Sequence, residues 1–223
     1  MIIFQNVSKK YRNGLRALKN LSLYIPEGSI TFITGHSGAG KTTMLKLIAL
    51  NETATSGQVF VDNQDLAKLR GRHVSKYRRN VGFVFQEHKL LADRTIESNV
   101  ALPLIVAGMS EVERKCRNRV RAALDLVSLE HLAESYPDML SVGEQQRVGI
   151  ARAMVARPDV ILADEPTGNL DPDLADEVME LFFRLQEHET TVVIATHDYR
   201  HLSNPAAGCL MLDHGHLVED ENS

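Results

Sequence analysis

The sequence has little of what would mark an exported or nucleic-acid-binding protein. Its 223 residues include only two cysteines, and its net charge is −4. Cys116 lies in a charged segment and Cys209 in an apolar one, so we expect two reduced cysteines in a cytoplasmic protein. The slightly negative charge provides no electrostatic footprint for DNA or RNA, and we expect no nucleic-acid partner.

Long hydrophobic runs are also missing. The longest candidate, residues 100–109, contains Pro103 and falls well short of the roughly 20 residues that span a bilayer. The amino terminus begins with strand-like apolar residues, where a signal segment would begin with basic ones. With 43% apolar residues, the chain suits one domain with a full core and a smaller subdomain.

The hydrophobic pattern predicts two kinds of sheet. Short apolar runs at residues 2–7, 21–25 and 58–61 are separated by turn residues, which favours antiparallel strands. Helical spacing of apolar residues covers 111–127, and 128–135 is also expected to be helical. Further on, helices at 143–156 and 174–187 alternate with strands at 160–163 and 191–195, which indicates a parallel sheet with crossover helices.

One stretch fits the phosphate-loop pattern Gly-x-x-x-x-Gly-Lys-Ser/Thr: Gly35-His36-Ser37-Gly38-Ala39-Gly40-Lys41-Thr42. It lies between an apolar run at 30–34 and a helix-like segment at 41–50. Glycines let backbone N–H groups wrap phosphates, and the following helix adds its positive end. Lys41 is placed to reach the β- and γ-phosphates, and the Thr42 hydroxyl to ligate Mg²⁺. The alternative is a tight strand-to-helix turn without a ligand.

Two further strands end in residues suited to phosphate chemistry. Asp164 and Glu165 follow the strand at 160–163, and His197 follows the strand at 191–195. Ligands bind at the carboxyl ends of parallel strands, so these side chains are expected to meet the phosphate loop. Asp164 would anchor Mg²⁺, Glu165 would polarise a water, and His197 would contact that water or the γ-phosphate. A helix cap for the acidic pair, an ordinary loop histidine, and a metal pair with His201 are the alternatives.

The next motif precedes the helix at 143–156: Leu140-Ser141-Val142-Gly143-Glu144-Gln145-Gln146-Arg147. By itself it predicts a helix capped by Ser141, with Glu144 completing a capping box. Together with the phosphate loop and the acidic pair, it resembles the signature of ATP-binding cassette (ABC) ATPases, usually Leu-Ser-Gly-Gly-Gln/Glu. Val142 replaces the first glycine, and Gly143 keeps the second, where a bare backbone allows a phosphate to approach.

The resemblance implies an α/β fold: a P-loop NTPase ABC cassette with a mainly parallel core sheet, an antiparallel β subdomain and a helical subdomain carrying the signature. The whole chain, 1–223, is then one ABC ATPase domain, with 1–85 and 157–223 forming the core and β subdomain and 86–156 the helical subdomain.

The family motifs also imply a role for each matching residue. Gly168-Asn169-Leu170-Asp171 resembles the D-loop. Catalysis would involve Glu165, His197 and Lys41, and Mg²⁺ would be held by Thr42, Asp164 and Gln86 of the Q-loop. ATP would contact Tyr11, which stacks on adenine, together with Gly35, His36, Ser37, Gly38, Ala39, Gly40, Lys41, Thr42, Thr43, Ser141, Gly143 and Glu144.

The resemblance further implies a homodimer in which ATP is sandwiched between the phosphate loop of one chain and the signature of the other. Residues 77–91, with Asp93-Arg94-Thr95 after them, are most similar to family members that serve bacterial cell division from the cytoplasmic face of the inner membrane, bound to an integral membrane partner. We expect Leu90 and Leu91 to be exposed for that partner, and Val100 and Leu102 to be partly core. Lipoprotein-releasing or export ATPases and a non-hydrolysing ATP-binding scaffold remain alternatives.

Two other classes fit less well. A small-molecule kinase would not need the signature motif, and a DNA-repair cassette would need a long coiled-coil insertion for which the chain has no room. The basic stretch at 114–121 could contact nucleic acid or anionic lipid, but acidic residues nearby favour a solvated helix face.

Overall fold

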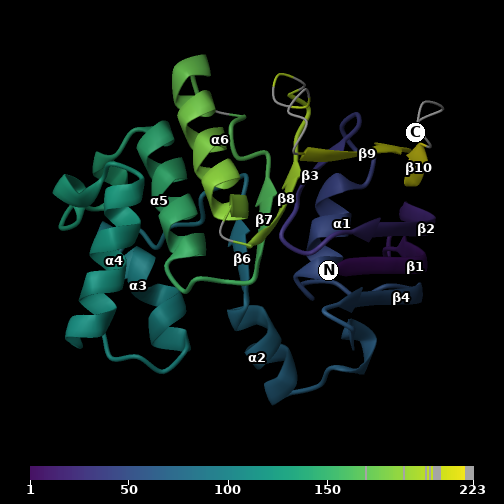
Figure 1. Cartoon of the computed structure of the whole chain (residues 1–223), viewed down its shortest axis with the longest axis horizontal. Coiled ribbons are helices and arrows are strands. Elements are labelled where there is room, and N and C mark those ends of the chain that lie inside the picture. The colour runs from purple at the N-terminus through teal and green to yellow at the C-terminus, as the bar shows by residue number, and fades with distance from the viewer. Residues whose placement is uncertain (169, 188, 199, 201, 203–206, 219–223) are drawn as a thin grey trace.

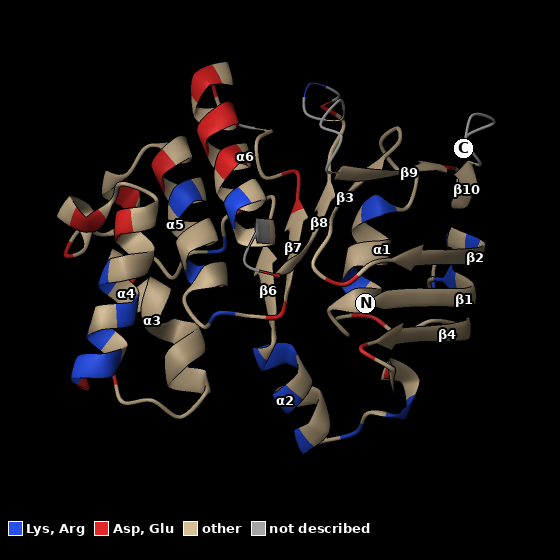
Figure 2. Cartoon of the chain, viewed as in Figure 1, with Lys and Arg blue, Asp and Glu red and all other residues tan. Residues whose placement is uncertain are grey.

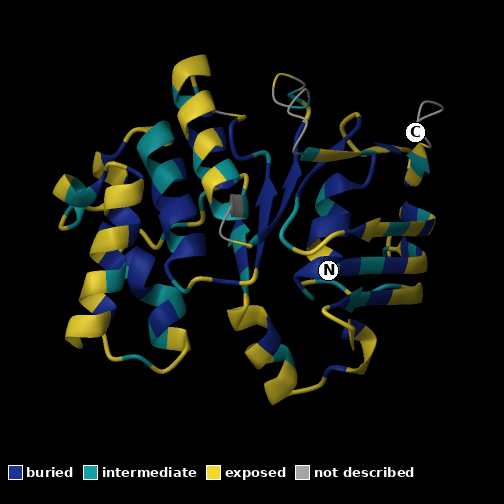
Figure 3. Ribbon diagram, in the orientation of Figure 1, coloured by how far each residue is buried: buried dark blue, intermediate teal, exposed yellow. Residues whose placement is uncertain are grey.

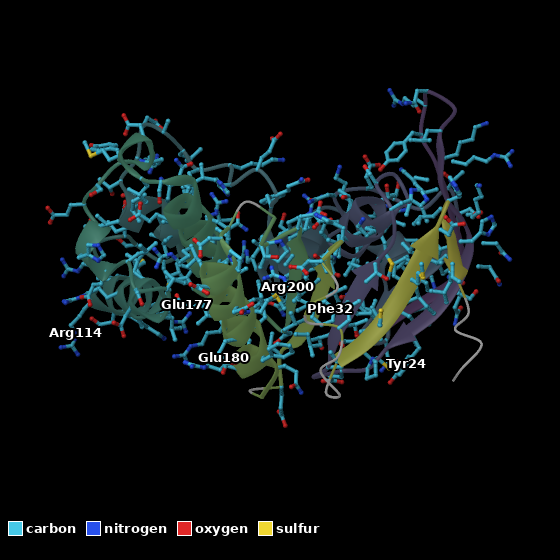
Figure 4. The ribbon with its side chains drawn as sticks, turned by 90° about the horizontal axis from the view of Figure 1, so that it is seen from above. Tyr24, Phe32, Arg114, Glu177, Glu180 and Arg200 are labelled. Atoms are coloured by element: carbon cyan, nitrogen blue, oxygen red, sulfur yellow. The ribbon has the colours of Figure 1, made fainter. Side chains whose placement is uncertain are left out.

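The computed structural model describes residues 1–168, 170–187, 189–198, 200, 202 and 207–218. A six-stranded sheet lies in the middle of the molecule, with a helical part on one side and a four-stranded sheet on the other (Figure 1). Seen from above, Arg114 of the helical part lies near one end of the molecule, Tyr24 of the four-stranded sheet lies toward the other, and Phe32 lies between them (Figure 4).

The central sheet has the order β10-β9-β3-β8-β7-β6. All neighbouring strands are parallel except the β9–β10 hairpin. Every residue of β3, β7 and β8 is buried, as expected for apolar, β-branched strands that are covered on both faces. The strands are β3 (Ile30–Thr34), β6 (Val81–Val84), β7 (Val160–Asp164), β8 (Thr191–Ala195), β9 (Ala207–Asp213) and β10 (His216–Val218).

The second sheet is antiparallel and has the order β2-β1-β4-β5. Its strands are β1 (Ile2–Lys10), β2 (Arg16–Ile25), β4 (Ser56–Val61) and β5 (Gln64–Asp65). The turn-separated apolar runs in the first third of the sequence therefore form an antiparallel sheet, as predicted.

The helices are α1 (Lys41–Ile48), α2 (Arg72–Arg79), α3 (Ile96–Val106), α4 (Arg114–Leu126), α5 (Val142–Met154) and α6 (Pro172–Glu187), with short 3₁₀ helices η1 (Leu66–Lys68), η2 (Glu130–Leu132) and η3 (Pro137–Met139). Helices α3, α4 and α5 pack against one another away from the four-stranded sheet. None of the described helices is long and apolar enough to cross a membrane.

The central sheet separates two hydrophobic cores. Phe32, Ile161 and Val192 pack with α3 to α6, whereas the next residues along the strands, Ile33, Leu162 and Val193, pack with α1 and the four-stranded sheet. Successive strand side chains point to opposite faces, so the same short apolar runs supply both cores. Figure 3 shows these strands as the buried centre of the molecule.

Two segments differ from the sequence prediction. Residues 128–135 do not form a helix beyond η2, because Ser128 adopts a positive φ of 58° that ends the helical path after α4. Helix α3 was not predicted, since its apolar residues show no helical period and Pro103 lies inside it. Both cysteines are free, with Cys116 buried and Cys209 exposed.

Candidate functional site

The phosphate loop joins β3 to α1 and depends on two glycines. Gly35 has φ 135°, and a Cβ there would collide with the carbonyl oxygen of Leu212. Gly40 has φ 114°, and a Cβ there would lie 2.6 Å from the carbonyl oxygen of Ala17. A side chain at either position would be strained and would push the loop away from the strands that support it.

Lys41 begins α1 and points back into the loop. Its Nζ donates a hydrogen bond to the carbonyl oxygen of Gly35 at 2.6 Å and lies 3.8 Å from Oε1 of Glu165. The side chain is buried, and the loop holds this positive charge where phosphates would lie in the predicted pattern.

Asp164 ends β7 beside the first turn of α1. The Thr42 hydroxyl donates to Asp164 Oδ1 at 3.0 Å. Burial raises the pKa of the Asp164 carboxyl, and the nearby Glu165 raises it further, while the Thr42 hydrogen bond lowers it. A hydroxyl and a carboxylate side by side form an oxygen donor set that fits Mg²⁺, which keeps several waters and takes few protein ligands. A bound cation would also offset the cost of ionising this buried acid.

Glu165 and His197 face each other from the ends of β7 and β8. Glu165 Oε2 lies 2.8 Å from Nδ1 of His197 and accepts a second hydrogen bond from the His197 backbone N–H at 3.3 Å. The Glu165 side chain is 12% exposed and that of His197 71% exposed. Glu165 has a positive φ of 49°, a strained backbone conformation that is typical of functional sites.

Gly40, Lys41, Thr42, Glu165 and His197 line one cleft of about 560 Å³. Leu15, which precedes β2, and Ala17 of that strand line it as well, although nothing in the sequence distinguished them from other apolar residues. The residues that line the cleft are Leu15, Ala17, Ser37, Gly38, Ala39, Gly40, Lys41, Thr42, Thr43, Gln86, Glu165 and His197. Residues 37–43 of the phosphate loop, Gln86, Glu165 and His197 therefore come together, whereas Gly35, His36 and Asp164 are not among the described residues that line the cleft.

Tyr11 is not among the described residues that line the cleft. It lies beside the cleft, because its hydroxyl is 3.2 Å from Oγ1 of Thr43, and Lys9 Nζ is 5.0 Å from its ring centre. Tyr11 thus lies next to Leu15 and α1, at the edge of the cleft. Its role in stacking on adenine stays a prediction.

The signature residues lie outside the cleft, at the start of α5. Ser141 caps the helix: its hydroxyl accepts from the Glu144 N–H at 3.3 Å, and Glu144 accepts from the Ser141 N–H at 2.8 Å. The Glu144 carboxylate also accepts from the Ser141 hydroxyl at 2.7 Å, and this bond and the one from the Ser141 N–H lower the pKa of Glu144. Val142 is exposed, and a Cβ at Gly143 would lie 3.0 Å from the side chain of Leu174.

The segment after Gln86 is held by two side chains whose role the sequence did not reveal. Asn99 is fully buried, and its amide nitrogen donates to the carbonyl oxygens of Leu91, Arg94 and Thr95. Arg152 of α5 donates to the carbonyl oxygens of His88 and Lys89. Because Asn99 and Arg152 bond to backbone oxygens, only the folded chain shows the connection between this segment and the signature helix.

Leu90 and Leu91 differ in exposure, contrary to expectation. Leu91 is 41% exposed, but Leu90 packs partly against the hydrophobic core. The expectation that Leu90 is exposed is wrong. Val100 belongs to the core and Leu102 is partly buried, in agreement with the expectation that these two residues are partly core. Asn169 of the D-loop motif and His201 of the possible metal pair lie outside the described residues.

The basic stretch on α4 lies largely on the solvent face of that helix. Its apolar side, including Cys116 and Val120, is buried, and Arg121 pairs with Glu130. Figure 2 shows acidic and basic residues in the same helical part of the molecule, in line with a solvated face.

Comparison with known proteins agrees with this geometry. Residues 18–168 match the family model of the ABC transporter. The chain is 48% identical to the cell division ATP-binding protein FtsE of Escherichia coli strain K12 over 97% of each chain. It is 43% identical to FtsE of Bacillus subtilis strain 168, over 100% of this chain and 96% of that protein.

The ATP-binding cassette MJ0796, solved as a dimer in a post-hydrolysis state with ADP and Pi, superimposes with a TM-score of 0.92 at 38% identity, over 99% of this chain and 98% of that one. The predicted α/β cassette fold is thereby confirmed, and the match extends well beyond the phosphate loop. The chain belongs to the ABC transporter family, as one of its ATP-hydrolysing cassettes.

Proposed function

We propose that the cleft hydrolyses ATP with Glu165 as the general base. The observation that supports this proposal is that Glu165 contacts both Lys41 and His197, and that all three residues line the cleft. Lys41 would bind the β- and γ-phosphates, and Glu165 would accept the proton of the attacking water. His197 would orient Glu165 and contact the γ-phosphate. Mg²⁺ held by Thr42, Asp164 and Gln86 would neutralise charge on the phosphates.

Two chains would share each nucleotide. The capped start of α5 presents backbone N–H groups and a positive helix end at an exposed site outside its own cleft, so its signature residues Ser141, Gly143 and Glu144 would contact the ATP of a second chain. Tyr11 would stack on the adenine. The dimeric state of the cassette MJ0796 supports this arrangement.

The physiological role that we propose is bacterial cell division, as an ATPase that drives an integral membrane partner resembling FtsX and so controls peptidoglycan hydrolases. The names of the similar FtsE proteins support the division role. The chain would lie at the cytoplasmic face of the inner membrane at the division site, with residues 86–156 moving as the helical subdomain that meets the partner. The Asn99 and Arg152 hydrogen bonds would transmit that movement.

The test replaces the chromosomal gene with a Glu165→Gln variant and captures the chain from native membranes. We expect filamentous cells, particularly at low osmolarity, and an FtsX-like membrane protein among the captured partners. Normal division with lipoproteins accumulating at the inner membrane would contradict the division role and place the chain with the lipoprotein-releasing ATPases.

A further inference from the structure

Two histidines and one aspartate, whose side chains are of the kinds that bind metals, meet at the phosphate loop outside the residues that line the cleft. His36 of the loop faces Asp213 and His214 at the β9–β10 turn, and one ligand atom from each lies within 4.8 Å of the others. His36 Nε2 is 3.1 Å and His214 Nε2 3.9 Å from the same Asp213 oxygen, Oδ1. The residues come from segments far apart in sequence, so the fold brings them together.

The backbone holds the two segments in this relation. The Gly215 N–H donates to the Ala39 carbonyl oxygen at 2.9 Å, and the Lys19 N–H donates to the Gly215 carbonyl oxygen at 2.8 Å. The missing Cβ of Gly35 lets the Leu212 carbonyl approach the start of the loop. The β9–β10 turn is therefore held against the phosphate loop at Ala39 and close to it at Gly35, on either side of His36.

The contacts of the His36 ring leave one nitrogen free to face the cluster. Its Nδ1 lies 2.7 Å from the Ser37 carbonyl oxygen, to which an Nδ1–H would donate. Its Nε2 then lies 3.1 Å from Asp213 Oδ1, on the side of the ring where a metal ion would bind. A histidine that donates one N–H to a backbone carbonyl while its other nitrogen binds metal is the usual arrangement at metal centres.

We propose that His36, Asp213 and His214 bind a Zn²⁺-class divalent transition-metal ion that couples the β9–β10 turn to the phosphate loop. Two imidazoles and one carboxylate suit Zn²⁺ and disfavour Mg²⁺, which prefers oxygen ligands. Since all three residues are exposed, water would complete the coordination. Bound metal would fix His36 and add positive charge next to Ser37, which lines the cleft. This coupling rests on the proposed nucleotide binding, but the metal site does not.

The first experiment titrates the untagged full chain with Zn²⁺ by calorimetry, without nucleotide and with millimolar Mg²⁺ present. We expect one zinc per chain, and binding at least about tenfold weaker in His214→Ala and in Asp213→Asn. His216→Ala, a neighbouring exposed histidine outside the cluster, and His197→Ala, in the cleft, should bind zinc like the parent chain. Absence of zinc binding, or its loss in His197→Ala with retention in His214→Ala, overturns the proposal.

The second experiment measures the affinity for fluorescent ADP with and without micromolar zinc, under excess Mg²⁺ so that magnesium saturates the free nucleotide. We expect zinc to raise the affinity about fivefold in the parent chain and to leave it unchanged in His214→Ala. Zinc binding without any effect on ADP affinity would overturn the coupling. Failure of all variants to bind ADP would contradict the proposed function and leave the zinc titration to decide the metal site.

Discussion

Glu165 Oε2 lies 2.8 Å from Nδ1 of His197, across the ends of the neighbouring strands β7 and β8. This hydrogen bond fixes one carboxylate oxygen, and the Glu165 backbone with φ 49° directs the other toward Lys41. In the proposed mechanism Glu165 would thus be a pre-oriented base at the cleft, and His197, which is open to solvent, would contact a bound phosphate.

Replacement of Glu165 by Gln should retain Mg-ATP binding and lower the hydrolysis rate by a factor of about 10² or more, because the amide cannot accept the proton of the attacking water. The trapped ATP should hold two chains together. Size-exclusion chromatography with light scattering should show a dimer in Mg-ATP that separates in ADP, and a monomer in both nucleotides would rule out the sandwich. Glu130→Gln, in the surface ion pair with Arg121 of the helical part and not among the described residues that line the cleft, provides a control that should hydrolyse normally.

Lys41→Ala should abolish ATPase activity mainly through lost nucleotide binding, because the substitution removes the buried positive charge beside the phosphate loop. Calorimetric titration with Mg-ATP would measure the loss, which we expect to exceed about tenfold. Lys46→Ala, an exposed lysine of the same helix, should keep activity within about twofold of the parent chain. Equal turnover in Lys41→Ala and the parent would refute the central role of the loop.

Gly35→Ala should destabilise the protein by about 2–5 kcal/mol, because the new methyl group meets the Leu212 carbonyl oxygen at a positive φ. Chemical denaturation of the nucleotide-free chain would measure this change. Gly14→Ala is the matched control: it also has a positive φ, but nothing lies within 4 Å of the added Cβ, and it should cost only about 1 kcal/mol. Equal losses of stability in the two variants would show that the positive φ alone, and not the close approach of the Leu212 carbonyl, explains why residue 35 is a glycine.

Asp164→Asn should raise the thermal stability of the nucleotide-free chain at neutral pH while abolishing Mg²⁺-dependent hydrolysis. Burial raises the pKa of Asp164, so the folded state binds this proton more tightly than the unfolded state does. The ionised acid destabilises the fold above the raised pKa, and this penalty disappears as the pH falls below the unfolded value of 3.8. The difference in Tm between the variant and the parent should therefore shrink as the pH falls. A constant difference would contradict the raised pKa.

Leu91→Glu should weaken binding of the membrane partner and leave nucleotide binding intact, because a charged group would replace an exposed apolar contact. Co-purification of the partner with each variant would measure the effect, which we expect to exceed about tenfold. Val112→Glu, at a residue that is 76% exposed in the same helical part, should bind the partner like the parent. Leu90→Glu is unsuitable, since Leu90 packs against the core and its change would destabilise the fold.

The local order of the sequence was enough to predict much of this protein. Glycine spacing around Lys41, the acidic pair after a buried apolar run, and Ser141 three residues before Glu144 each depend on neighbours in the chain, because turns, caps and strand ends are local structures. The antiparallel part of the fold followed from short apolar runs separated by turn residues, and the parallel part from the alternation of helices with strands. The helix expected at 128–135 failed because the φ of one serine breaks the helix, which the periodicity does not show.

The tertiary structure alone decided which groups from distant segments meet. Asn99 and Arg152 bind backbone oxygens, so no side-chain pattern marks their partners. The contact of His36 with Asp213 depends on the β9–β10 turn being bonded to the loop by Gly215. The exposure of Leu91 next to a packed Leu90 likewise depends on how the chain folds over the core. Residue types and spacing determine what a segment can do chemically, whereas packing between segments determines which other residues it contacts while doing so.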